Sequence, residues 1–292
     1  VSASMDTTAR IWSASSGECM RELKGHEHEV TCVSFSPGGE HVLTASADRT
    51  AKLWAAASGE CERTLAGHRG CVQSAAFSPD GRKVLTAAAD RTARIWSAAS
   101  GACVLTLEGH RHDVVSCASW SPDGAEVVTA SFDRTAKLWD AVSGECVLTL
   151  AGHRGIVTSA AWSPDGTSVV TASADGTAKA WSAESGQCTM TFEGHQGWVR
   201  SAVWSPDGRQ VLTASADNTA RIWDAVSGAC DRVFNGHEEA VTSAVWSADG
   251  QQVLLGSSDS TATIWSAASG ALVRTLEGHQ GSVVSAAFSP SS

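Results

Sequence analysis

The sequence lacks the marks of several protein classes. Its apolar runs all fall short of the roughly 18 residues that a membrane span needs, and no charged and then apolar leader opens the chain. No Cys-Xaa-Xaa-Cys pair favours a zinc site, and no glycine-rich phosphate loop follows a strand. Positive charge is scarce, since 21 Lys and Arg stand against 31 Asp and Glu. The net charge of −10 disfavours nucleic acid and anionic lipid as partners.

From these absences we expect a soluble monomer with no membrane or nucleic-acid partner, no metal and no cofactor. The chain begins with Val1 rather than Met, which favours an excised domain or a processed product.

What the sequence does contain is a repeat. The dipeptide Gly-His occurs seven times at steps of 42 or 43 residues, and an Asp follows each of the first six His by 22 or 23 residues. A Trp stands six residues after each of these Asp. A repeat of this length with these signatures is typical of one four-stranded propeller blade. The dipeptides begin at Gly25, Gly67, Gly109, Gly152, Gly194, Gly236 and Gly278.

One repeat, read over residues 26 to 68, predicts four short strands. Residues 30–35 and 41–46 alternate apolar with small polar side chains and are separated by a Ser-Pro-Gly-Gly turn. A tight turn around Asp48 leads to a third strand at 50–54, and a loop ending at Gly59 leads to an outermost strand at 60–65. No segment has a helical period, so the prediction is all-β with four antiparallel strands per blade.

These motifs, together with Ser-Pro-Asp-Gly turns and Trp-Asp at Asp140 and Asp224, resemble the WD-repeat β-propeller family over the whole chain. The resemblance implies a seven-bladed β-propeller. Elsewhere the Asp after Trp is replaced by Ser or Ala, at a strand end where this matters little for the fold.

The two chain ends complement each other. Residues 2–12 align with the second and third strands of a blade, while residues 283–288 align with a first strand that has no blade of its own. We therefore expect a single domain over 1–292 whose last blade combines one C-terminal strand with three N-terminal strands, which removes an exposed sheet edge. One extra residue between His110 and Trp120 is interpreted as a β-bulge. The predicted blades are 26–66, 68–108, 110–151, 153–193, 195–235, 237–277, and 279–292 with 1–24.

Six cysteines occupy one position of the repeat. On neighbouring blades they would lie beyond the ~7 Å Cα separation that a disulfide allows. We expect small buried side chains in a reducing compartment, and hence a cytoplasmic protein. These residues are Cys19, Cys61, Cys103, Cys146, Cys188 and Cys230.

Each repeat also brings together His, Ser, Asp and Trp, a set that on paper resembles a hydrolase triad. Repetition around a ring argues against catalysis, which needs one unusual environment. The family resemblance instead implies a structural tetrad of hydrogen bonds. Its expected members are His26, Ser46, Asp48 and Trp54; His110, Ser131, Asp133 and Trp139; His153, Ser173, Asp175 and Trp181; His195, Ser215, Asp217 and Trp223; His237, Ser257, Asp259 and Trp265; and His279, Ser4, Asp6 and Trp12.

One repeat departs from the set. His68, Asp90 and Trp96 are present, but Ala88 stands where Ser is expected. We therefore predict that the Trp96 indole lacks its hydroxyl partner, at a cost of about 1 kcal/mol.

Function should lie where the repeats differ, in the loops after Gly-His and around the turn Asp. Trp198 and Phe132 are large aromatic residues at loop positions, which suits binding anchors; the alternative is that each packs against a neighbouring blade. Five arginines, at 69, 91, 111, 134 and 154, fall on three consecutive blades, while Glu27, Glu29, Glu238 and Glu239 come from two others. This rim could orient an acidic or phosphorylated partner, or be solvated with local ion pairs. The candidate residues are Trp198, Phe132, Arg69, Arg111, His112, Arg154 and His28.

The leading functional hypothesis is a non-catalytic scaffold that binds a protein or peptide through this loop-rich face. A propeller enzyme is the rival from another class. The third hypothesis is a recently amplified or engineered repeat array with no dedicated ligand, because the repeats are so alike.

Overall fold

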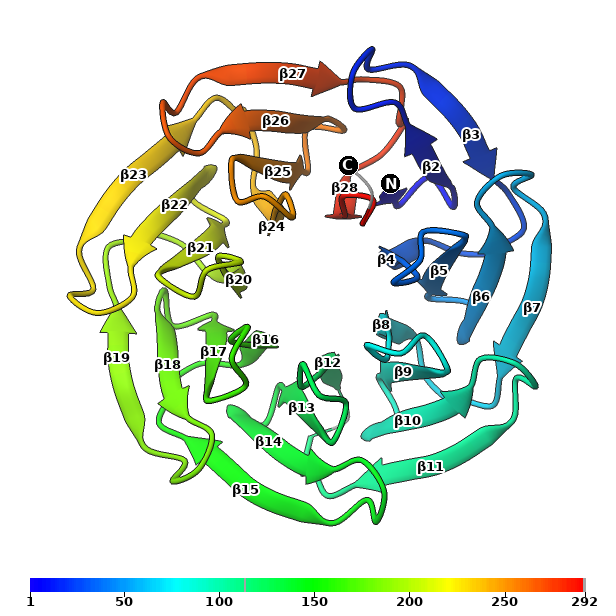
Figure 1. Cartoon of the computed structure of the whole chain (residues 1–292), viewed down its shortest axis with the longest axis horizontal. Coiled ribbons are helices and arrows are strands. Elements are labelled where there is room, and N and C mark those ends of the chain that lie inside the picture. The colour runs from blue at the N-terminus through cyan, green and yellow to red at the C-terminus, as the bar shows by residue number, and fades with distance from the viewer. Residues whose placement is uncertain (113, 291–292) are drawn as a thin grey trace.

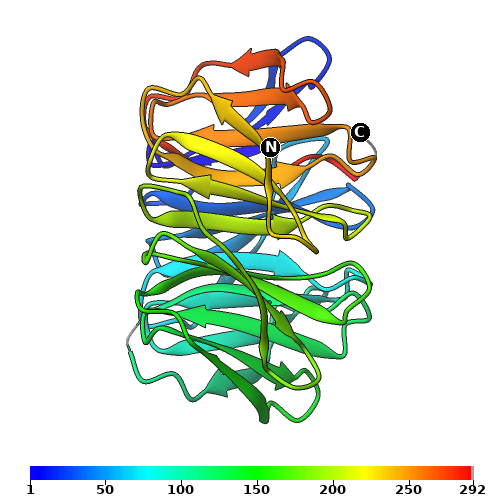
Figure 2. The ribbon, with the colours of Figure 1, turned by 90° about the vertical axis from the view of Figure 1, so that its left-hand side faces the viewer.

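Seven four-stranded antiparallel sheets form a closed ring in the computed structural model, which describes residues 1–112 and 114–290 (Figure 1). The described residues contain strands and turns and no helix. In each blade the first strand lies nearest the axis of the ring and the fourth lies at its circumference (Figure 1). Seen edge-on, the ring carries connecting loops along both rims (Figure 2). The predicted all-β, seven-bladed propeller is confirmed.

The blades are numbered from the first complete one. Blade 1 holds β4 (Val30–Phe35), β5 (His41–Ser46), β6 (Thr50–Ala55) and β7 (Cys61–Ala66). Blade 2 holds β8 (Val72–Phe77), β9 (Lys83–Ala88), β10 (Thr92–Ser97) and β11 (Cys103–Glu108). Blade 3 holds β12 (Val115–Trp120), β13 (Glu126–Ser131), β14 (Thr135–Asp140) and β15 (Cys146–Ala151). Blade 4 holds β16 (Val157–Trp162), β17 (Ser168–Ser173), β18 (Ala178–Ser182) and β19 (Cys188–Phe192).

The remaining strands complete the ring. Blade 5 holds β20 (Val199–Trp204), β21 (Gln210–Ser215), β22 (Thr219–Asp224) and β23 (Cys230–Asn235). Blade 6 holds β24 (Val241–Trp246), β25 (Gln252–Ser257), β26 (Ala262–Ser266) and β27 (Leu272–Leu276). Blade 7 holds β28 (Val283–Ala286) with β1 (Ser2–Ser4), β2 (Ala9–Trp12) and β3 (Cys19–Leu23).

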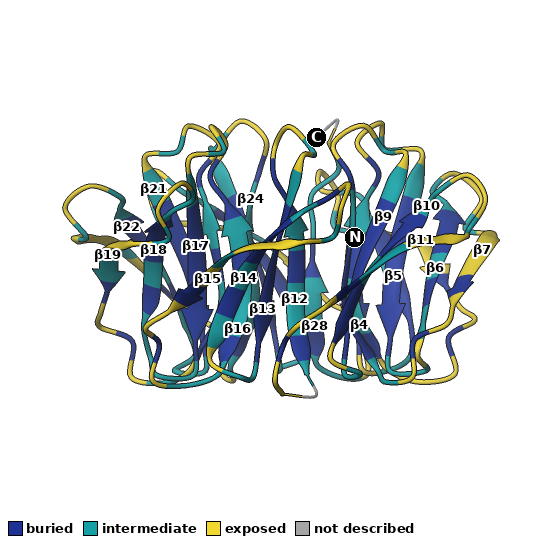
Figure 3. Ribbon diagram, turned by 90° about the horizontal axis from the view of Figure 1, so that it is seen from below, coloured by how far each residue is buried: buried dark blue, intermediate teal, exposed yellow. Residues whose placement is uncertain are grey.

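The core lies between blades. Leu43 and Leu65 of blade 1 cluster with Val72, Val84 and Trp96 of blade 2, and equivalent clusters recur around the ring. Because each sheet is covered on both faces by its neighbours, the second strands are buried almost throughout, whereas the fourth strands are mostly exposed (Figure 3). This explains why the second strands read as nearly continuous runs of small and apolar residues.

Blade 7 closes the ring by pairing the two chain ends. β28 is hydrogen-bonded to β1, with Ser2 opposite Ala286, and the Val1 amine donates to the Ala287 carbonyl at 2.8 Å. The predicted closure, one C-terminal strand with three N-terminal strands, is confirmed. An apolar cavity of about 240 Å³ remains between blades 6 and 7, bordered by Trp12 and Phe288 among others.

The interpretation of the extra residue of blade 3 as a β-bulge is wrong. β12 begins five residues after His110, whereas β4 begins four residues after His26. The insertion therefore lengthens the loop before β12, a loop that includes position 113, outside the described residues. The register shift between Val115 and Cys117 has counterparts in blades without an insertion, as between Val30 and Cys32.

The prediction of buried cysteines is also wrong. The six repeated cysteines are free and exposed, because each stands at the start of a fourth strand, whose first residues face solvent. In blade 1, for example, the Cys61 thiol lies 3.6 Å from the Arg63 carbonyl oxygen, and the first buried residue of the strand is Leu65.

Candidate interaction face

A buried chain of hydrogen bonds fixes the start of each blade. In blade 1 the Trp54 indole N–H donates to Thr44 Oγ1 at 2.8 Å, and Thr44 Oγ1 lies 2.7 Å from His26 Nε2. His26 Nδ1 lies 2.7 Å from Asp48 Oδ2. The Asp48 carboxylate can only accept, so Nδ1–H donates to it, and Nε2 of the neutral imidazole then accepts the proton of the Thr44 hydroxyl. Every polar side-chain group of this four-residue network is thus paired, as buried polar groups generally are.

The hydroxyl in this network comes from Thr44 and not from Ser46, so the predicted serine is wrong. Trp54 stands directly opposite Val42 in the ladder. Thr44 is therefore its diagonal neighbour, within reach of an aromatic side chain, and Ser46 is two residues farther along. The same holds for the other predicted serines of the set: Ser131, Ser173, Ser215, Ser257 and Ser4. The hydroxyls are supplied by Thr129, Thr171, Thr213, Thr263 and Ser2.

The serines have a different task at the rim. Ser46 Oγ accepts the backbone N–H of Asp48 at 3.1 Å and donates to the His28 carbonyl at 3.1 Å. It therefore ties the loop after Gly-His to the turn that carries the Asp. The other five serines accept the N–H of their turn Asp in the same way.

Two blades show how the network tolerates change. In blade 2 the Trp96 indole donates to Thr86 Oγ1 at 2.8 Å, so the predicted defect at Ala88 does not exist. In blade 6 Leu255 replaces the threonine of the second strand. There the hydroxyl comes from the third strand, where Thr263 contacts both His237 and Trp265. The sequence signal for this exchange is Thr263, which stands where blades 1 to 5 have Lys or Arg.

The turn Asp also positions the loop that follows Gly-His. In blade 3 Asp133 Oδ2 accepts from His110 Nδ1 at 2.8 Å and from the backbone N–H of Arg111 at 3.0 Å. Burial raises the pKa of this carboxyl, but the hydrogen bonds from Thr135, Arg111 and His110 outweigh burial and lower the pKa to about 2. The backbone after His110 is thus held by an ionised carboxylate, while the Arg111 side chain is exposed.

Six blades share this anchor, and the anchored residue varies. The backbone N–H groups bound by the turn Asp belong to Glu27, Arg69, Arg111, Arg154, Gln196 and Gln280. All six side chains are exposed. The result is a rim on which a constant scaffold displays side chains that differ from blade to blade.

Family comparisons agree with this geometry. The family model described as "IFT122 first beta-propeller" matches residues 115–292, and the model described as "WD domain, G-beta repeat" matches residues 17–55 and 59–97. The chain belongs to these WD-repeat β-propeller families. Nuclear distribution protein PAC1 of Mycosarcoma maydis is 44% identical over 41 residues, which are 14% of this chain and 9% of that protein. The matched part of the chain thus spans less than a tenth of that relative.

On the rim of this WD-repeat propeller, Trp198 is the exposed aromatic residue of blade 5. Its side chain is 48% exposed, and the Arg200 guanidinium lies 5.3 Å from the centre of its ring. Its backbone carbonyl accepts the N–H of Ala216, so the loop itself is tied to the turn. Trp198 therefore lies at the surface, with about half of its area accessible to a partner.

Phe132 lies differently. It is half-buried in the turn of blade 3 and its ring packs against the His112 ring, with centroids 6.0 Å apart. The structure brings these two candidate residues together within one blade. Trp198 belongs to blade 5, two blades away, and is separate from them.

The charged residues of the rim are exposed and segregated. Arg69, Arg111 and Arg154, each directly after Gly-His, belong to blades 2, 3 and 4, while the acidic residues at that position, Glu27 and Glu238, belong to blades 1 and 6. Arg91 and Arg134 follow the turn Asp at a position that has a positive φ in every blade, including Arg49 of blade 1. That position is set by the turn, so the residues after His are the more specific part of the basic arc.

Within the described residues, no group of three or more His, Cys, Asp or Glu side chains is arranged to hold a metal ion. No helix among them is long and apolar enough to cross a membrane.

Proposed function

We propose that this propeller is a non-catalytic platform that binds a protein or peptide on the rim formed by the loops after Gly-His and the turns around the turn Asp. The observation that carries the proposal is the contrast between fixed backbone and variable side chain at this rim. Backbones held by buried networks preorganise a surface, which reduces the entropy cost of binding. Membership of the WD-repeat propeller families supports the proposal.

Within this surface we assign Trp198 as the apolar anchor and the arginines of blades 2 to 4 as the polar arc. An indole that is almost half exposed buries a large area when a partner covers it. The arc favours a partner with acidic or phosphorylated groups on that side. The imidazole nitrogens and hydroxyls of the networks are already paired, which supports a scaffold role rather than a reaction. The exposed free cysteines suit the cytoplasm, which we propose as the compartment.

A selection from a random peptide library displayed on phage tests this proposal. We expect enriched peptides that lose about tenfold or more in affinity for Trp198→Ala, the loss typical of a truncated hot spot. The matched control is Val226→Ala, because Val226 is 85% exposed but lies in the loop between β22 and β23 on the opposite rim. Equal loss for both variants, or no enrichment, would overturn the proposal and favour an array with no dedicated ligand.

A further inference from the structure

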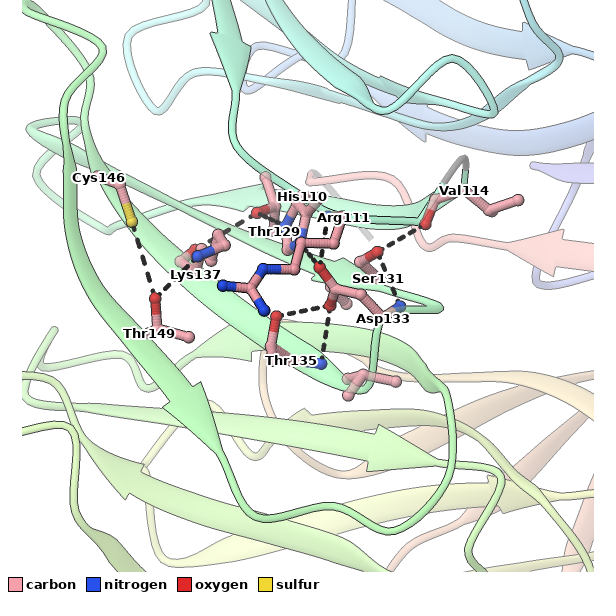
Figure 4. A network of polar contacts seen from close by, with 12 residues as sticks. His110, Arg111, Val114, Thr129, Ser131, Asp133, Thr135, Lys137, Cys146 and Thr149 are labelled. Carbon is pink, nitrogen blue, oxygen red and sulfur yellow. Dashed lines mark hydrogen bonds and ion pairs between the residues drawn. The ribbon is translucent and has the colours of Figure 1, made fainter.

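Blade 3 has a recess on this rim that is lined by two cationic side chains. Arg111 follows the blade's Gly-His, and Lys137 lies on β14. Together with Asp133, Thr135 and Thr149 they line a recess of about 320 Å³. Figure 4 shows the Arg111 guanidinium beside Lys137 and Thr135.

Among the described residues, the carboxylate that lines the recess is Asp133, and both of its oxygens accept hydrogen bonds. Asp133 Oδ1 accepts from the backbone N–H and the hydroxyl of Thr135 at 3.0 and 2.6 Å. Its other oxygen accepts from His110 and from the backbone of Arg111. Burial also lowers the pKa of His110, which keeps that imidazole neutral. Both oxygens of Asp133 are thus occupied by hydrogen bonds from its own blade.

The two cations keep donors for a ligand. Lys137 Nζ donates one hydrogen bond, to Thr149 Oγ1 at 2.8 Å. Among the residues that the structure describes, neither Arg111 nor Lys137 forms an ion pair. An ammonium has three N–H donors and a guanidinium five. Both groups can therefore bind the oxygens of one anion.

The equivalent recess of blade 2 contains an additional carboxylate. In blade 2 Arg69, Arg91 and Arg94 line a recess of about 430 Å³, and Glu108 lines it as well as the turn Asp. Glu108 is the last residue of β11 and pairs with Thr92. In blade 3 the residue at that register is Ala151, opposite Thr135.

The other blades lack one of the two cations or have a glutamate at the register of Ala151. Blade 4 has Glu193 at the register of Ala151, and in blade 7 Arg10 is paired with Glu22 at 3.1 Å. Blades 1 and 6 have Glu27 and Glu238 in place of Arg111, and blade 5 has Gln196. The combination of Arg, Lys and Ala is therefore particular to blade 3.

We propose that Arg111 and Lys137 form a binding site for a phosphate monoester, presented by a phosphorylated side chain of the bound peptide. A phosphorylated residue carries about −1.5 to −2 charges at pH 7 and three acceptor oxygens, which suits two cations with several free donors. Thr135 and Thr149 border the same recess. This inference rests on the proposed function and names the chemistry of part of its partner.

The test uses the full chain and the probe N-acetyl-O-phosphoserine methylamide at fixed ionic strength. The Nε–H NMR signal of Arg111, assigned with Arg111→Lys, reports binding. We expect a saturable shift of this signal, with an affinity about tenfold above that of N-acetylglutamate methylamide because the phosphoryl group carries roughly twice the charge. Equal affinity for the two probes would overturn the phosphate assignment.

Ala151→Glu tests the site without removing a cation. It places in blade 3 the carboxylate that blade 2 already has, and it should weaken phosphoserine binding about tenfold through competition for the cations. Ala66→Glu in blade 1 is the matched control, because Ala66 is exposed at the same register and adds the same charge to the molecule. We expect it to change the affinity less than twofold.

The outcomes separate this inference from the proposed function. If selected peptides bind through Trp198 but phosphoserine binding is the same in Ala151→Glu and wild type, the anion site is wrong and the platform stands. If phosphoserine binds as expected but the library gives no peptides, the platform is wrong while the anion site stands.

Discussion

Thr263 and Leu255 stand directly opposite each other on β26 and β25, and between them they reverse the arrangement of the other blades. In blade 1 the same pair is Thr44 on the second strand and Lys52 on the third. Directly paired side chains share one face of a sheet. The hydroxyl can therefore reach the same His and Trp from either strand, and the network of blade 6 keeps its distances of 2.7 and 2.8 Å.

This relationship predicts a rescue. Thr263→Val should leave the His237 imidazole and the Trp265 indole buried without a hydroxyl, which destabilises the protein by about 1–3 kcal/mol. Adding Leu255→Thr should return a hydroxyl from β25 and recover most of the loss. Urea unfolding of the two variants and wild type measures the effect. A double variant no more stable than Thr263→Val would contradict the exchange of roles.

A second prediction separates the threonine from the serine position in blade 2. Thr86→Val should cost about 1–3 kcal/mol, because His68 Nε2 and the Trp96 N–H both contact this hydroxyl. Ala88→Ser should instead stabilise by about 0.5–1 kcal/mol, since other blades use that serine to accept the N–H of the turn Asp. Thermal unfolding of each variant measures the change in stability. A larger change for Ala88→Ser than for Thr86→Val would contradict the assignment of the network hydroxyl to Thr86.

The sequence predicted the architecture well because period and motif spacing are properties of whole repeats. Seven Gly-His steps and the alignment of the two ends were enough for the blade number and for the closure by β28. The sequence alone could not tell whether Thr44 or Ser46 supplies the network hydroxyl. Both side chains lie on the same face of the strand, and only the strand register opposite Trp54 distinguishes them. The exposure of Cys61 was missed because a repeated cysteine resembles a core position until its strand is known to be outermost.

Acid should destabilise the protein in two stages. Burial lowers the pKa of five network imidazoles below the usual 6.5, so the unfolded chain takes up protons first and stability falls as the pH drops below about 6.5. These are His26, His110, His153, His195 and His279. Burial raises the pKa of the turn carboxyls, but the hydrogen bonds that they accept outweigh burial. The pKa values of the Asp6 and Asp133 carboxyls are lowered from 3.8 to about 2. Their contribution is present above about pH 4 and is lost below it.

Urea unfolding at pH 8, 7, 6, 5 and 4 measures the first stage, and measurements at pH 3 and 2 extend it to the second; NMR titration of the imidazoles assigns the first stage. In a chain that begins at Val1, burial also lowers the pKa of the Val1 amine, to about 5, and this group acts in the same direction. A free energy of unfolding that stays constant between pH 7 and 5 would show that the networks do not exclude protons.

Removal of residues 279–292 should break the closure. β28 would no longer pair with β1, leaving an open sheet edge. Asp6 and Ser2 would also lose their contacts with His279. We expect a lower midpoint and a broader thermal transition, with different midpoints by far-ultraviolet circular dichroism and Trp fluorescence. Trp198→Ala, which alters only the exposed rim, should keep the wild-type cooperativity. One sharp transition for the truncated chain would mean that blade 7 is not needed for closure.

The last prediction creates a site instead of removing one. Blade 2 has counterparts of both cations of blade 3, Arg69 and Arg94, in a recess that Arg91 and Glu108 also line. If that carboxylate is what distinguishes the blades, Glu108→Ala should give a second phosphoserine site, and the Nε–H signal of Arg69 should shift with the probe as that of Arg111 does. Glu277→Ala is the control, because Glu277 directly follows β27 in blade 6, where Glu238 and Thr263 stand in place of the two cations. An unshifted Arg69 signal in Glu108→Ala would mean that two cations without a nearby carboxylate are insufficient, and that blade 3 binds through some further feature of its own loop.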